Sequence, residues 1–254
     1  MAAVLLLVAP SSALRVCGLD IAHAKPSPAS RSLDGYIRDG WPSSFPYSRQ
    51  DLTPLMAGND RLFYLMPKLV QHAGEECRAA LTDFYAAVLP QHDGDVLDLC
   101  SSWTSHYPAA WKGRRVVALG LNPIELMLNP SKTEWRVQDL NSEPKLPFDD
   151  GSFEVITNSL SVDYLTKPVE VFAEMARVLK PGGVACCAFT NRCFPTKVVP
   201  IWTKPFTEEN HARIVGSYFH YSSPLWAEIG VADVSPDGWA GQRDPAVVVI
   251  GRKC

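Results

Sequence analysis

The stretch Asp95–Tyr107 constrains the fold of this chain more than any other. Its sequence is DVLDLCSSWTSHY: after Asp95 comes a short apolar run, Val96, Leu97 and Leu99 around the carboxylate of Asp98, and the stretch then breaks into hydroxyl residues. The run is too short for a helix and turn-forming residues follow it at once, which is typical of a buried parallel strand. Ligands of parallel α/β domains bind across the carboxyl ends of such strands. The sequence therefore predicts an α/β domain with a binding site at this point.

The segments that follow alternate between strand and helix patterns. Further strands are expected at 115–119, 135–138, 155–157 and 184–189, and a helix begins at Pro168 and is closed by the sequence KPGG at 180–183. Two C-terminal runs, 231–234 and 246–250, are predicted to pair as an antiparallel hairpin. Residues 94–254 are therefore expected to form a doubly wound α/β core with a mostly parallel sheet.

Residues 51–89 are predicted to form a helical cover beside the binding edge of the sheet. Two helical segments are expected, and in the second the apolar side chains between Cys77 and Val88 recur at helical spacing. Tyr64 and His72 of this cover either close the ligand pocket or take part in ordinary packing.

Residues 1–32 have the composition of a leader. They contain one acidic residue, Asp20, and their apolar run from Ala2 to Ala9 is far too short to span a bilayer. An organelle transit peptide is favoured, with a secretory signal and a disordered tail as alternatives. The segment is expected to contribute nothing to the fold, which leaves residues 33–254 as the domain.

The charge and cysteine content exclude several classes of function. Twenty-four basic and 27 acidic residues give a net charge of −3, so the overall balance attracts neither nucleic acid nor an anionic membrane. A small-molecule partner is favoured instead. The seven cysteines lack paired spacing, so neither a disulfide framework nor a metal site is expected.

Asn122, which follows the second predicted strand, has two possible roles. It is suited to N-cap a helix that starts at Pro123, with Glu125 as the reciprocal partner of a capping box. It also lies at the tip of the strand, where a side chain can reach the ribose hydroxyls of a bound nucleoside. Both roles can hold, because an amide donates and accepts hydrogen bonds.

Three motifs in the right order and spacing resemble class I S-adenosylmethionine-dependent methyltransferases that act on small molecules. They are DVLDL, LPFDDGSFEVI and ARVLKPGG, within roughly residues 95–189. The resemblance implies a seven-stranded Rossmann-like sheet and S-adenosylmethionine as cofactor, with Asn122 facing the ribose and Asp139 with Leu140 bracketing the adenine. The cofactor-binding residues that it implies are Asp98, Cys100, Ser101, Ser102, Asn122, Asp139 and Leu140.

The chain departs from this family at two points. The family's glycine-rich loop, DLGxGxG, has Cys100, Ser102 and Thr104 at its glycine positions here, so side chains crowd the ligand. A positive φ would be costly there, at Thr104 in particular. The usual acidic partner of the ribose is replaced by neutral Asn122.

A second resemblance concerns the segments SSWTSHYP, GLNPIEL, QDLN, SVDYL and FTNRCFPTK. They are similar to a plant, algal and cyanobacterial branch of methyltransferase-like proteins of unassigned substrate. This branch implies a photosynthetic source and agrees with a transit peptide. A chloroplast location is therefore expected, and a cytoplasmic one otherwise.

Five residues are candidates for chemistry on the acceptor, although the sequence assigns none of them as catalytic. They are His106, Ser161, Asp163, Tyr164 and Arg192. His106 lies where the first helix of the core is expected to begin, and His106 or Asp163 is a candidate base. Arg192 either holds a carboxylate or phosphate of the substrate or forms a surface ion pair.

The function expected from these patterns is transfer of a methyl group from S-adenosylmethionine to a small-molecule acceptor. The alternative is a methyltransferase-like protein that binds a ligand or partner without catalysis, for instance in assembly of a plastid complex. A reductase is disfavoured, since no GxGxxG follows the first strand and Tyr164 and Lys167 lack the required spacing. The acceptor and the oligomeric state are left open.

Overall fold

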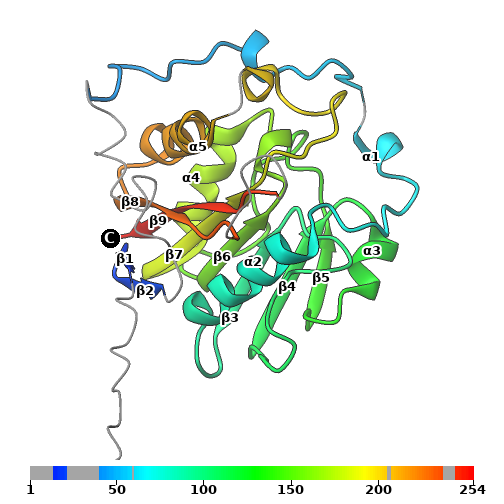
Figure 1. Cartoon of the computed structure of the whole chain (residues 1–254), viewed down its shortest axis with the longest axis vertical. Coiled ribbons are helices and arrows are strands. Elements are labelled where there is room, and N and C mark those ends of the chain that lie inside the picture. Colours follow the sequence, from blue (N-terminus) through cyan, green and yellow to red (C-terminus); the bar gives the residue numbers. More distant parts are fainter. Residues whose placement is uncertain (1–13, 22–39, 59, 205–206, 237–243) are drawn as a thin grey trace, which may run out of the picture.

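The computed structural model describes residues 14–21, 40–58, 60–204, 207–236 and 244–254. Its centre is a seven-stranded sheet of order β5-β4-β3-β6-β7-β9-β8 (Figure 1). The strands are β3 (Asp95–Leu99), β4 (Arg115–Gly120), β5 (Glu134–Val137), β6 (Phe153–Ser159), β7 (Leu179–Phe189), β8 (Trp226–Asp233) and β9 (Val247–Lys253). The helices are α1 (Asp60–Phe63), α2 (Glu75–Val88), α3 (Pro123–Leu128), α4 (Pro168–Val178) and α5 (Glu208–Ser222), with short 3-10 turns at Gln50–Leu52, Val162–Tyr164 and Pro200–Thr203.

The pairing of the strands confirms the predicted fold class. Five strands, from β5 to β7 in the sheet order, run parallel, with Leu97 of β3 opposite Val117 of β4 and Ile156 of β6. β9 is antiparallel to both β7 and β8, so the predicted C-terminal hairpin is present. The molecule is a doubly wound, mostly parallel sheet with one antiparallel edge.

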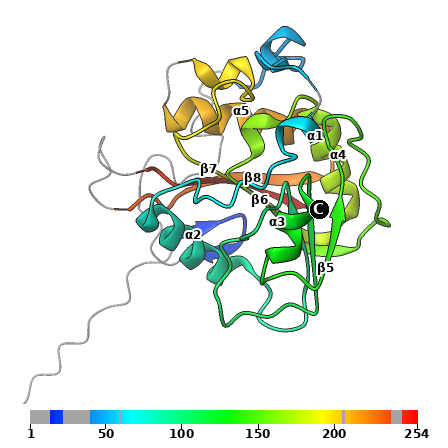
Figure 2. The same ribbon diagram turned by 90° about the vertical axis from the view of Figure 1, so that its right-hand side faces the viewer.

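Both faces of the sheet are covered, so the opening strand β3 is buried along its whole length. Alternate residues of β3 enter different cores: Leu97 packs with α4 and α5, whereas Val96 packs with α2. Figure 2 shows α2 and α5 on opposite sides of the sheet. None of the helices among the described residues combines the length and apolarity needed to cross a bilayer.

The helix expected after the first core strand is absent. Residues 100–114, all of them described, contain only turns and irregular backbone, so the placement of His106 at a helix start was wrong. Two left-handed residues, Cys100 and His106, interrupt any helical run, and Tyr107 packs edge-on against Tyr85 of α2. Helix α2 therefore shields the part of the sheet next to this loop.

The N-terminal cover is only partly helical. The second predicted helix is present as α2, but the first is reduced to the single turn α1 and is followed by irregular backbone up to residue 74. Pro67 lacks an N–H and restricts its neighbour, which opposes helix in this segment. Residues 60–72 are called the strap below.

Part of the expected leader belongs to the fold. Residues 14–21 form a hairpin of β1 (Leu14–Val16) and β2 (Leu19–Ile21). Val16, Cys17 and Ile21 are buried in the core beside α2, and the Arg252 Nε donates to the Cys17 carbonyl at 2.5 Å. The expectation that residues 1–32 add nothing to the fold was wrong for this hairpin, and the rest of that segment lies outside the described residues.

Candidate functional site

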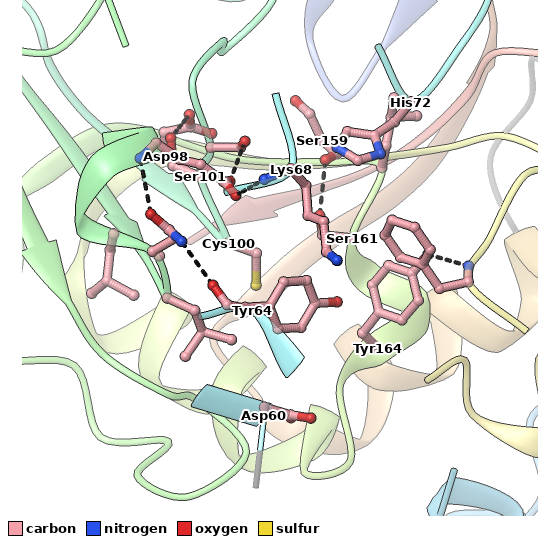
Figure 3. A pocket seen from close by; sticks show the side chains of 18 of the residues that line it. Asp60, Tyr64, Lys68, His72, Asp98, Cys100, Ser101, Ser159, Ser161 and Tyr164 are labelled. Atoms are coloured by element: carbon pink, nitrogen blue, oxygen red, sulfur yellow. Dashed lines mark hydrogen bonds between the residues drawn. The ribbon is translucent and has the colours of Figure 1, made fainter. Parts of the chain in front are cut away.

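A cavity of about 320 Å³ lies between the strap and the carboxyl ends of the parallel strands (Figure 3). Residues that follow β3, β4, β5, β6 and β7 line one side, and strap residues such as Tyr64 and Lys68 line the other. This is the edge at which doubly wound sheets bind ligands, and the volume lies in the range of small-molecule sites. The cavity is the candidate site.

Most residues selected from the sequence meet at this cavity. The lining contains all seven predicted cofactor residues: Asp98, Cys100, Ser101, Ser102, Asn122, Asp139 and Leu140. Four acceptor-side candidates, His106, Ser161, Tyr164 and Arg192, line it too, as do Tyr64 and His72. Asp163 does not. The lining residues meet at the carboxyl edge of the sheet because each of them lies at or after the end of a strand or in the strap above that edge.

Asp98 is the centre of a buried hydroxyl network. Its Oδ2 accepts hydrogen bonds from the Ser101 and Ser105 hydroxyls, both at 2.6 Å, and its Oδ1 accepts one from the Thr157 hydroxyl at 2.9 Å. Burial raises the pKa of Asp98 to about 6. The carboxylate therefore joins the loop after β3 to β6 through these hydroxyl side chains.

Four members of this network, Ser105, Tyr107, Asn129 and Thr157, were not selected from the sequence as site residues. The Tyr107 hydroxyl donates to Thr157 Oγ1 at 2.6 Å, which leaves the Thr157 proton for Asp98. Asn129 Nδ2 donates to Ser105 Oγ at 2.8 Å. The available signal was Thr157, a hydroxyl residue in an otherwise apolar predicted strand, because a buried polar side chain needs a partner.

Backbone strain is concentrated along the cavity. Cys100, His106 and Leu160, all lining residues, have φ values of 54°, 58° and 56°. Such left-handed non-glycine residues cost about 1–3 kcal/mol each and cluster at functional sites. Cys100 thus adopts a glycine-like conformation at the first of the three altered positions. Thr104 has no positive φ, so the cost considered for it does not arise there.

The loop after β3 also lies unusually close to β4. The Ser101 N–H donates to the Leu119 carbonyl at 2.8 Å, and a Cβ at Gly120 would lie 2.2 Å from the Ser101 carbonyl oxygen. Only glycine fits at position 120. The loop that lines the cavity is therefore fixed to both neighbouring strands of the sheet.

Asn122 caps α3 as predicted, and its amide is fully used. Oδ1 accepts from the N–H groups of Ile124 and Glu125 at 2.9 and 3.1 Å, while Nδ2 donates to the carbonyls of Tyr64 and Leu65 at 2.7 and 3.2 Å. The two lone pairs and two protons of the amide each have a partner inside the chain. Asn122 can contact a ribose only if the strap gives up these carbonyl contacts.

Glu125 has a different role from the predicted capping box. Its carboxylate accepts from the Lys68 N–H and from the Ser102 hydroxyl, both at 2.6 Å. Glu125 thereby joins the strap to the loop after β3 and does not complete the cap of Asn122.

A buried ion pair holds the start of the strap. Lys197 is 4% exposed, pairs with Asp60 and donates to the Met56 carbonyl at 3.0 Å. Asn141 Nδ2 also donates to Asp60, at 2.9 Å. Polar contacts from three separate loops thus keep the strap closed over the cavity.

The cavity wall formed by the strap and by the segments after β6 and β7 is aromatic. The ring centroid of Phe194 lies 5.9 Å from that of Tyr164 and 5.7 Å from that of His72. The Phe63 ring packs against both Phe194 and Tyr64. Figure 3 shows Tyr64 and Tyr164 facing the same space. Offset aromatic side chains of this kind accommodate a flat apolar group.

The two histidines of the cavity are neutral at physiological pH. Burial, with a contribution from Arg78 and His72, lowers the pKa of His106 to about 4, and burial also lowers the pKa of His72. A neutral imidazole can accept a proton, although a pKa near 4 makes His106 a weak base.

The remaining acceptor-side candidates differ in their surroundings. Asp163 is 3% exposed below the cavity wall, its Oδ2 finds no hydrogen-bond partner among the described residues, and burial raises its pKa to about 8. A carboxyl group outside the cavity cannot take a proton from a ligand inside it. Arg192 lines the cavity and pairs with Asp244 at 2.7 Å, so the predicted ion pair is present.

Comparison with known sequences gives one family and a set of relatives. Residues 98–187 match the family described as "Methyltransferase domain". A demethylmenaquinone methyltransferase of Clavibacter sepedonicus is 31% identical over 157 residues, which cover 60% of this chain and 57% of that protein. One from Listeria monocytogenes is 28% identical over 159 residues, covering 59% and 61%. The match thus spans about three fifths of the length of these curated relatives.

Comparison with solved structures agrees with the architecture. The [4+2]-cyclase SpnF has a TM-score of 0.50 and 16% identity, with 83% of this chain and 99% of that chain covered. An S-adenosylmethionine-dependent methyltransferase from Mesorhizobium loti has a TM-score of 0.48 and 17% identity, with 69% and 98% covered. At these identities the likeness concerns the fold alone.

Proposed function

This chain carries a class I S-adenosylmethionine-dependent methyltransferase domain, and we propose that it transfers a methyl group from S-adenosylmethionine to a small-molecule acceptor. The observation that supports this most is the cavity at the carboxyl edge of the sheet, which is lined by all seven predicted cofactor residues and by an aromatic wall. Cofactor and acceptor therefore have adjoining surfaces in one enclosed space.

The residues present fit the cofactor in two respects. The left-handed Cys100 and the obligatory Gly120 keep the loop after β3 in a glycine-loop path close to the sheet. Asp139 accepts three hydrogen bonds, from the Asn141 N–H and from the Ser142 N–H and hydroxyl, so one of its four acceptor sites is left for an adenine amino group. Leu140 provides an apolar contact beside it.

The proposed chemistry is mainly positioning. S-adenosylmethionine, when bound, supplies a methyl group that is already activated by a positively charged sulfur. The strap and the aromatic wall exclude water and hold the acceptor in line, which is where such an enzyme gains most of its rate. Neutral His106 or His72 accepts the proton that the acceptor loses, if it loses one.

The aromatic wall favours an acceptor with a flat ring. Tyr164, Phe194 and His72 form that wall, and Ser161 adds a hydroxyl that lines the same cavity. The names of the relatives, demethylmenaquinone methyltransferases, describe proteins that methylate a ring compound. A ring-bearing small molecule is therefore the acceptor class that we propose.

Calorimetric titration of the full chain with S-adenosylmethionine and S-adenosylhomocysteine tests the cofactor assignment. Saturable binding that is weakened by Leu140→Trp, a change that fills the adenine side of the cavity, would support it. Leu225→Trp, at the opposite edge of the sheet, is the matched control and leaves binding unchanged. Failure of both compounds to bind at high micromolar concentration would refute the methyl-transfer proposal.

A non-catalytic binding protein is the second candidate, and two observations favour it. The amide of Asn122 is saturated by contacts within the chain, and no helix follows β3 to direct its N-terminus at the cavity. The fold itself is compatible with other chemistry, since the [4+2]-cyclase shares it. If the titrations are negative while ring compounds still bind the cavity, this second function is the better one.

The proposed location is the chloroplast, on the composition of residues 1–32. Because residues 14–21 belong to the core, we propose that any processing takes place before Leu14. Mass spectrometry of the protein recovered from plastids measures the mature N-terminus, and a start after residue 21 would contradict the proposal.

A further inference from the structure

The outer side of the strap carries an unusual series of exposed apolar side chains. Leu62, Leu65 and Met66 are 72%, 68% and 71% exposed, and Leu69 is about half exposed. The inner side of the same segment lines the cavity through Tyr64 and Lys68. The two sides of the strap thus face different surroundings, a ligand cavity and the exterior.

Helix α3 continues this apolar surface. Ile124, Met127 and Leu128 are each close to half exposed or more. The helix adjoins the strap, because Asn122 at its N-cap donates to strap carbonyls and Glu125 accepts from the Lys68 N–H. We call the outer side of the strap and these three residues of α3 the apolar face. Soluble monomers rarely expose so many large apolar side chains on adjoining segments.

The charges at the apolar face are basic, although the whole chain has a net charge of −3. Between residues 61 and 70 the ionisable side chains are Arg61 and Lys68, and between 124 and 132 they are Glu125 and Lys132. Glu125 is 6% exposed and is used by the strap. Lys68 lines the cavity, so the charges that the apolar face presents to the exterior are those of Arg61 and Lys132, and both are positive.

We propose that the apolar face binds the surface of an anionic lipid membrane. Exposed Leu, Met and Ile side chains insert below the lipid headgroups, while Arg61 and Lys132 lie near the anionic phosphates. The complementarity of charge distinguishes this occupant from a second copy of the chain, which would place basic residues against one another. The proposal goes beyond methyl transfer and does not depend on it.

The position of the apolar face gives this binding a consequence for the cavity. Val70 both lines the cavity and is 55% exposed, so the apolar face reaches the rim of the cavity. A molecule dissolved in the lipid can therefore approach the cavity without crossing open solvent. Asn122 and Glu125 contact the strap, so membrane binding that moves the strap acts on these contacts and on the access of a ligand to the cavity.

The test is cosedimentation of the full chain with phosphatidylcholine vesicles, with and without phosphatidylglycerol. The unmodified protein should bind the phosphatidylglycerol vesicles and be released by salt. Leu65→Glu should weaken this binding at least about tenfold, because it removes an inserted side chain and adds a repelled charge. Leu225→Glu is the matched control at the opposite edge of the sheet and should bind like the unmodified chain.

Three outcomes would overturn the proposal. Absence of binding to either vesicle, or equal binding to both, refutes an anionic lipid partner. Unchanged binding by Leu65→Glu refutes the assignment to this face, and Met66→Glu provides the same test should Leu65→Glu not fold by circular dichroism. A dimer in lipid-free light scattering that Leu65→Glu dissociates, without vesicle binding, would assign the face to a second copy instead.

Discussion

Cys100 combines the backbone of a glycine with a side chain that packs against the core. Its φ of 54° costs about 1–2 kcal/mol for any residue with a Cβ. Replacement by Gly and by Ala removes the same thiol, but only Gly removes the strain. Glycine loses about 0.5–1 kcal/mol of this advantage, because it has greater freedom in the unfolded chain. We therefore expect the unfolding free energy of Cys100→Gly to be higher than that of Cys100→Ala by up to about 1 kcal/mol. Urea denaturation measures the difference, and a more stable Ala variant would contradict the left-handed conformation.

Asp163 makes the stability of the molecule dependent on pH. Burial raises its pKa from 3.8 to about 8, so the folded chain keeps a proton that the unfolded chain releases. The stabilisation is complete below pH 4 and is lost as the pH rises towards 8. The Asn side chain of Asp163→Asn cannot ionise. We therefore expect the melting temperature of this variant, relative to that of the unmodified protein, to rise between pH 5 and pH 8 and to stay constant above pH 8.

Asp98 and His106 also titrate below pH 7, and their effects are the same in both variants. The raised pKa of Asp98 gives stability that is lost as the pH rises from about 4 to 6. The lowered pKa of His106 has the opposite sign, since its stabilisation is lost as the pH falls from 6.5 to about 4. A constant difference between Asp163→Asn and the unmodified protein across pH 5–8 would show that Asp163 is already ionised in the folded state.

At the scale of elements, the strap depends on the amide protons of Asn122. Asn122→Asp keeps the acceptor oxygen that caps α3, but it replaces two donors with a carboxylate oxygen that faces the carbonyls of Tyr64 and Leu65. We expect a loss of about 1–3 kcal/mol in unfolding free energy and faster proteolysis of the strap. Asn122→Leu removes the cap as well and should cost about 0.5–2 kcal/mol more. Equal strap proteolysis in Asn122→Asp and the unmodified chain would contradict these contacts.

Elements whose signals are local were predictable from the sequence. The strand at Asp95, the cap at Asn122 and the helix at Pro168 each follow from a few neighbouring residues. The absent helix after β3 was not predictable in this way. The loop in its place is held by the hydrogen bond between Thr157 and Asp98, residues that are 59 positions apart in the chain. In the strap, Pro67 is a local signal against helix, but the closure of the strap over the cavity depends on Asn122 and Lys197, which lie far along the sequence.

At the scale of the whole molecule, the sequence predicted that the site residues meet at one edge of the sheet. It did not predict which distant segments pack together. Parallel topology brings every strand-end residue to one edge, which places Asn122 and Asp139 in the same cavity. The composition of residues 14–21 placed the hairpin in the leader. Nothing within the hairpin shows that Gly230 leaves room for Val16, or that the Ile250 carbonyl accepts a hydrogen bond from the Cys17 thiol. Long-range packing decides such cases.

The hairpin leads to a prediction about truncation. A chain that lacks residues 1–13 should match the full chain in unfolding free energy, because the hairpin is intact. A chain that lacks residues 1–21 exposes the core beside α2 and should be less stable by on the order of 2 kcal/mol, since a docked segment must gain more by burial than its ordering costs. Chemical denaturation of the three chains measures this. If the two truncated chains are equally stable, the hairpin is a dispensable part of the leader. Ile21→Ala in the full chain provides an independent check, because truncation of its fully buried side chain should cost about 2 kcal/mol, a loss limited by the free energy with which the hairpin docks.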